Sequence, residues 1–140
     1  MIDYDKLQKA LKHLEAQYAN HLAARDRPEL TEIDREGIAE SVIQRFETCF
    51  DTLWKDLTRY MTEDMGLPDV PSGPKPIIKF AAKNNLFANN VDAWINYANA
   101  RNSTAHDYSG EKAIQVIAVV GDFIDDAIGL YQTMTGTTWE

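Results

Sequence analysis

An arginine and a histidine that could act together on a phosphate lie within residues 101–108, RNSTAHDY. A guanidinium binds phosphate oxygens through its planar fork and an imidazole titrates near neutral pH, so this pair suits phosphodiester cleavage. RNA brings its own nucleophile, the 2′-hydroxyl. His106 could remove that proton or protonate the leaving oxygen, while Arg101 stabilises charge on phosphorus without a metal. Asn102 would orient one or both, and Tyr108 would offer a stacking surface or a hydroxyl donor.

This chemistry requires a break in the helix between the two side chains. On an unbroken helix, at ~100° per residue, Arg101 and His106 would point about 140° apart and could not share a phosphate. The polar residues 102–104 are indifferent helix formers, and a Ser-Gly pair follows at 109–110. The sequence therefore predicts that Arg101 lies in the last turn of one helix and His106 in the connection to the next.

Three long amphipathic helices are expected to support this segment. Apolar residues recur at alternating spacings of three and four over residues 4–25, 31–64 and 110–134. Thr31, followed three residues later by Asp34, is typical of an N-terminal capping arrangement for the second of these helices. The valine-rich part of the third keeps the helical period for longer than an ordinary strand lasts.

Two shorter helices are expected to lead directly into Arg101. Residues 65–73 are rich in proline and glycine and predict a loop. Pro74 is suited to the first position of a helix over 74–86. An asparagine pair at 89–90 offers a cap for a further helix over 91–102. The expected fold is an all-α, antiparallel bundle of four to five helices.

Length and composition predict one domain, residues 1–140, in a soluble cytoplasmic protein. Apolar residues make up 44% and charged residues 26% of the chain, and neither a membrane-spanning run nor a signal peptide is apparent. The single Cys49 has no partner for an internal disulfide and is expected to be a small core residue. His13 and His21 have no acid or cysteine at ligand spacing, so neither a metal nor a cofactor is predicted.

The charge distribution bears on whether this chain can bind a polyanion. A net charge of −8 opposes phosphate binding, but residues 71–112 carry five basic and three acidic side chains, a net +2, which leaves −10 for the rest. Lys75, Lys79 and Lys83 follow one another at i+4 and would form a stripe along one helix. This stripe is either a contact for the RNA backbone or an ordinary solvated face.

The string RNSTAHDY resembles the signature of HEPN domains, in which an arginine and a polar residue precede a histidine and, two positions later, a tyrosine. Helix order, chain length, residues 54–55 and the proline-rich loop also resemble the nucleotidyltransferase substrate-binding family and the related HepT toxins. The resemblance implies a homodimer that joins two Arg/His pairs in one RNA-cutting cleft. Arg101 and His106 would be catalytic, Asn102 supporting, and Tyr108 the residue to which a minimal nucleotidyltransferase transfers AMP.

Three functions follow from these observations. The first is a ribonuclease toxin of a toxin–antitoxin pair, acting on tRNA or mRNA and silenced by AMPylation. The second is a non-catalytic substrate-binding subunit of a two-component nucleotidyltransferase. The third is a structural helical bundle with an accidental motif, in which Arg101 and His106 would be buried and separated. Trp54, Trp94 and Tyr97 fit the apolar helix pattern and are expected in the core or a dimer interface, which leaves Tyr108 as the functional aromatic residue.

Overall fold

Five helices carry most of this computed structural model, which describes residues 1–87, 90–104 and 110–140. One turn of 3-10 helix follows the first helix and one π-helical turn, Tyr60–Asp64, extends the second. No strand occurs among the described residues, so the predicted all-α class is confirmed. The five helices are α1 (Asp5–Ala23), α2 (Glu32–Arg59), α3 (Pro74–Lys83), α4 (Val91–Ser103) and α5 (Gly110–Thr135).

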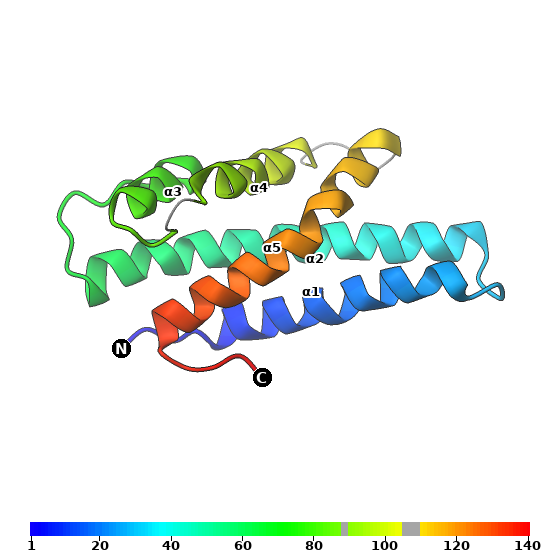
Figure 1. Cartoon of the computed structure of the whole chain (residues 1–140), viewed down its shortest axis with the longest axis horizontal. Helices are drawn as coiled ribbons and strands as arrows, with labels where there is room; N and C mark the ends of the chain where they lie inside the picture. Colours follow the sequence, from blue (N-terminus) through cyan, green and yellow to red (C-terminus); the bar gives the residue numbers. More distant parts are fainter. Residues whose placement is uncertain (88–89, 105–109) are drawn as a thin grey trace.

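Helix α2 is the centre of the arrangement, because it packs against each of the other four helices. Figure 1 shows α1 and α2 as a long antiparallel pair, with α5 crossing this pair diagonally. Helices α3 and α4 form a shorter layer along α2, and α4 also packs against α5. None of the helices in the described part of the chain is long and apolar enough to cross a membrane.

Local signals fix where two of the helices begin. The Thr31 hydroxyl accepts a hydrogen bond from the backbone N–H of Asp34 at 3.1 Å, and the Asp34 carboxylate accepts one from the backbone N–H of Thr31 at 2.9 Å. This reciprocal pair is the capping arrangement expected from the sequence. Helix α3 begins at Pro74, directly after Gly73, whose φ of 105° is a conformation that side-chain-bearing residues rarely adopt.

We expect Thr31→Ala to lower the free energy of unfolding by about 1 kcal/mol, because the substitution removes the acceptor for an N–H of the first turn of α2. Urea unfolding would measure the change. Thr133→Ala is the matched control, since the Thr133 hydroxyl only bonds back to the carbonyl of Gly129 within α5. Equal losses in the two variants would mean that the cap contributes nothing.

The position expected for the cap of the fourth helix is confirmed at Asn90, but the expected side-chain capping bond is not formed. Asn90 does occupy the N-cap position of α4, but its side chain makes no capping hydrogen bond. It donates instead to the carboxylate of Asp126 on α5 at 3.0 Å. Tertiary contact has therefore replaced the local bond, and Asn89 lies outside the described residues.

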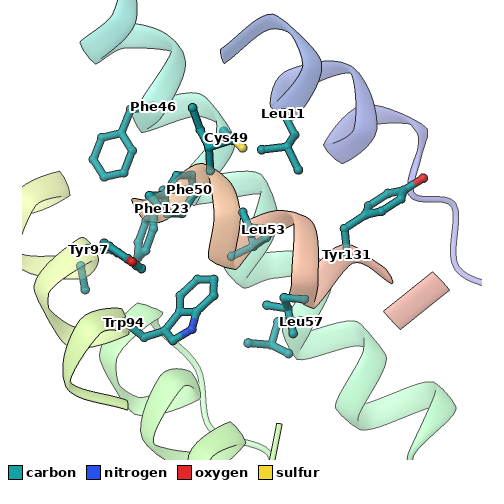
Figure 2. Close-up of a cluster of buried hydrophobic side chains, with 14 of the residues drawn as sticks. Leu11, Phe46, Cys49, Phe50, Leu53, Leu57, Trp94, Tyr97, Phe123 and Tyr131 are labelled. Atoms are coloured by element: carbon teal, nitrogen blue, oxygen red, sulfur yellow. The ribbon is translucent and has the colours of Figure 1, made fainter. Parts of the chain in front are cut away.

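An aromatic cluster closes the core between α2, α4 and α5 (Figure 2). Phe123 of α5 lies at its centre and is fully buried. Its ring centroid is 5.0 Å from that of Phe46 on α2 and 5.4 Å from that of Tyr97 on α4, both edge to face. Trp94 and Cys49 are buried in the same core, which confirms the core positions expected for them. The cluster therefore fixes α4 against α2 and α5.

Candidate functional site

Arg101 lies in the last turn of α4, as the sequence predicts. The helix ends at Ser103, so the break falls between Arg101 and His106 as their chemistry requires. The buried hydroxyl of Thr104 donates to the carbonyl oxygen of Arg101 at 2.8 Å, which satisfies one of the carbonyls left over at the helix end. The end of α4 is thus held by a side chain of its own segment.

Two carboxylates of α2 hold the guanidinium of Arg101. Its Nη1 lies 2.8 Å from Oε2 of Glu47, while Nε and Nη2 donate to Asp51 at 3.2 and 3.1 Å. The two acids are four residues apart and therefore share one face of α2. Thr104 also contacts the clamp, because its single hydroxyl proton can be donated to this Glu47 oxygen, 2.9 Å away, in place of the Arg101 carbonyl. We call Arg101, Glu47, Asp51 and Thr104 the arginine clamp.

The clamp orients the guanidinium and leaves part of the Arg101 side chain exposed. The side chain of Arg101 is 27% exposed, that of Glu47 12% and that of Asp51 38%. A fork held by charge-assisted bonds on two edges loses little further freedom when it binds an anion. The clamp also offsets the positive charge that the sequence count assigned to residues 71–112, because both acids come from α2. Sequence analysis missed Glu47 and Asp51.

The remaining candidates are distributed unevenly. Asn102 is exposed next to Arg101 at the end of α4, whereas His106 and Tyr108 lie outside the described residues. The three lysines of the expected stripe all lie on α3, where Lys75 is half-buried and the other two are exposed. In Figure 1 the C-terminal end of α4, which carries Arg101, points away from α3. Within one chain, the fold therefore does not bring the stripe to the arginine clamp.

A polar contact also joins α4 to α5. Buried Tyr97 donates its hydroxyl to the carboxylate of Asp126, which also accepts from Asn90. Burial, followed by this hydrogen bond, raises the pKa of Tyr97 well above its usual range. The phenol therefore stays protonated and works as a fixed donor in the core, not as a reactive group.

An all-α bundle with an arginine held at a helix end, five positions before a histidine, agrees with the resemblance drawn from the sequence. The chain belongs to the family described as "Nucleotidyltransferase substrate binding protein like", whose model matches residues 2–136. A Haemophilus influenzae protein named "Probable ribonuclease HepT" is 28% identical over 104 residues, which cover 73% of this chain and 70% of that protein. The family expected from the sequence is therefore confirmed.

The fold also matches a solved structure. A crystal structure of a protein from Thermus thermophilus aligns with a TM-score of 0.65 at 22% sequence identity, covering 87% of this chain and 98% of that one. At this identity the likeness concerns the fold, and it extends over nearly the whole of the other protein.

Proposed function

We propose that this protein is a metal-independent ribonuclease and the toxin of a toxin–antitoxin pair. Arg101 and His106 are its catalytic residues and Asn102 supports them. The observation that carries the proposal is the arginine clamp, which orients the guanidinium of a partly exposed arginine in the last turn of α4, five positions before the motif histidine. The name of the Haemophilus influenzae relative supports the same activity.

In the proposed reaction the 2′-hydroxyl oxygen of RNA attacks the adjacent phosphorus and the bond from phosphorus to the 5′ oxygen breaks. The products are a 2′,3′-cyclic phosphate and a 5′-hydroxyl. One imidazole takes the proton from the 2′-hydroxyl and another gives a proton to the leaving oxygen, so a homodimer that pairs two copies of His106 supplies both groups. Arg101 binds a non-bridging oxygen, on which negative charge builds in the transition state.

The clamp gives this reaction its geometry. A guanidinium that swings freely would have to be ordered when substrate binds, at a cost in side-chain entropy. Glu47 and Asp51 order the guanidinium before substrate binds, because they hold both edges of the fork. They also lower the net charge of the site, which favours contact with one phosphate at a fixed position over general attraction to polyanions.

Silencing follows from chemistry at Tyr108. A partner nucleotidyltransferase transfers AMP from ATP to the phenol oxygen, which forms a phosphodiester, releases pyrophosphate and loses the phenol proton. The modification adds a negative charge two residues from His106. That charge competes with the RNA phosphate for Arg101 and blocks the cleft by its bulk.

The second candidate is a binding subunit without catalysis, which acts by presenting a surface to a nucleotidyltransferase. Two observations favour it. The family description names substrate binding, and the charge of Arg101 is already offset by two carboxylates. In this alternative the clamp is a structural tie between α2 and α4.

Incubation of the purified protein with tRNA and mRNA in EDTA separates the two candidates. We expect cleavage by the unmodified protein, because the reaction uses no metal, and none after treatment with the partner nucleotidyltransferase and ATP. Tyr108→Phe, treated in the same way, is the matched control and should keep its activity. Absence of cleavage by every form, despite a stable complex with the partner, would favour the binding subunit.

A further inference from the structure

A basic hollow between α1 and α2 stands out in a chain of net charge −8. It encloses about 300 Å³ and is lined by Lys6, Lys9, Ala10, His13, Arg45 and Thr48. Three of these residues are permanently positive, and none of the described residues that line it is acidic. An adjoining hollow adds Lys12 beside Lys9 and His13. We call Lys6, Lys9, His13 and Arg45 the α1–α2 basic groove.

A contact within the groove prepares it for an anion. Nη1 of Arg45 lies 3.2 Å from Nδ1 of His13. Arginine can only donate, so Nδ1 of His13 acts as the acceptor in this contact. The other nitrogens of the Arg45 guanidinium remain donors for an anion, and Arg45 and His13 are both exposed.

The groove continues across the solvent face of α2 to the arginine clamp. Lys6 and Thr48 also line a second hollow of about 280 Å³, which adds the basic residues Lys55 and Arg59 and the acidic residues Asp51 and Asp56. Asp51 is the carboxylate that holds Nε and Nη2 of Arg101. The groove therefore ends close to the arginine clamp, with Asp51 between the second hollow and the guanidinium of Arg101.

We infer that the α1–α2 basic groove binds the backbone of single-stranded RNA beyond the phosphate that Arg101 contacts, an inference that rests on the proposed function. Its lysines are flexible point charges, suited to phosphates of any sequence. A protein partner fits less well, because protein interfaces are enriched in aromatic residues and depleted in lysine. The exposed large apolar residues Leu22, Ile33 and Ile114 do not line this groove.

The test measures binding of a short oligoribonucleotide whose 2′-O-methyl groups prevent cleavage, by fluorescence anisotropy over a range of salt concentrations. In Lys6→Gln/Lys9→Gln/Arg45→Gln we expect affinity at low salt to fall roughly tenfold or more and the salt slope to fall by about 2, since three phosphate contacts are lost. Arg25→Gln/Arg27→Gln/Lys112→Gln is the matched control. It removes the same charge from exposed residues outside the groove and should bind as the wild type does.

The outcomes separate this inference from the proposed function. Equal RNA affinities of the groove and control variants would overturn the inference that the groove binds RNA. The proposed ribonuclease activity would be unaffected, because the cleavage assay tests it separately. If the groove variant lost its complex with the nucleotidyltransferase but kept its RNA affinity, the groove would be a protein-binding site, and the inference of RNA binding would be overturned too. Groove-dependent binding by a protein that cuts no RNA would overturn only the proposed function. A charge-preserving variant, Lys6→Arg/Lys9→Arg/Arg45→Lys, should keep the RNA affinity. Circular dichroism checks that all of these variants fold.

Discussion

Replacing Arg101 with lysine is expected to reduce RNA cleavage by about a hundred- to a thousandfold although the positive charge stays. Lysine has no planar fork, so it cannot meet Asp51 through two nitrogens and Glu47 through a third, as the guanidinium does. An ammonium placed between the two carboxylates would be drawn toward them and away from the phosphate. Single-turnover cleavage of a labelled RNA by wild type and variant measures the effect.

Arg35→Lys is the matched control for this prediction. Arg35 also uses its whole fork, but it donates to the backbone carbonyls of Ala24, Arg27 and Leu30 at the far end of the α1–α2 pair. We expect this variant to unfold at a lower temperature than the wild type and to keep the same cleavage rate per folded molecule. Similar rates for Arg101→Lys and wild type would mean that Arg101 serves the fold alone and is not catalytic.

Local sequence was sufficient to predict the helices, because their signals involve residues a few positions apart. The bond from Asp34 to Thr31 spans three residues, and Pro74 begins α3 without any help from the rest of the fold. Leu7, Leu11 and Leu14 show the same principle in the core, since their spacing alone places all three on the buried face of α1.

The arginine clamp could not be predicted in the same way. Glu47 and Asp51 lie 54 and 50 residues before Arg101, and in the sequence they look like any other acids on the polar face of α2. An i,i+4 acid pair is a signal only once α4 is known to cross α2 at that turn. The net charge of residues 71–112 likewise did not predict the charge around Arg101, because the fold brings Glu47 and Asp51 from another segment.

Asn90 illustrates the competition between local and tertiary bonds. Its sequence position predicts a helix cap, and it does precede α4 directly. The carboxylate of Asp126, 36 residues later, accepts from its side-chain amide instead. A hydrogen bond to a carboxylate is stronger than one between neutral groups. This carboxylate also binds buried Tyr97. Its position depends on how α4 and α5 pack together, which cannot be predicted from the spacing of residues in the sequence.

Truncating Phe123 to alanine is expected to cost about 3–5 kcal/mol of unfolding free energy, the largest effect on stability that we predict. The ring is fully buried and meets Phe46, Tyr97 and Trp94 edge to face, so its removal leaves a cavity that three rigid neighbours cannot fill by small shifts. Urea unfolding followed by circular dichroism measures the loss, and the slope with urea should stay unchanged.

Two further variants connect this ring to the site. Phe80→Ala, at a half-buried position on α3, should cost clearly less, while Phe123→Leu keeps most of the volume and should cost less than about 1.5 kcal/mol. Phe123 joins α5 to both α2 and α4, and α4 must lie on α2 for Arg101 to reach its carboxylates. Cleavage should therefore persist in Phe123→Leu and fall in Phe123→Ala, in which α4 is held less firmly on α2. A loss below about 1 kcal/mol in Phe123→Ala would show that other contacts hold α4 in place.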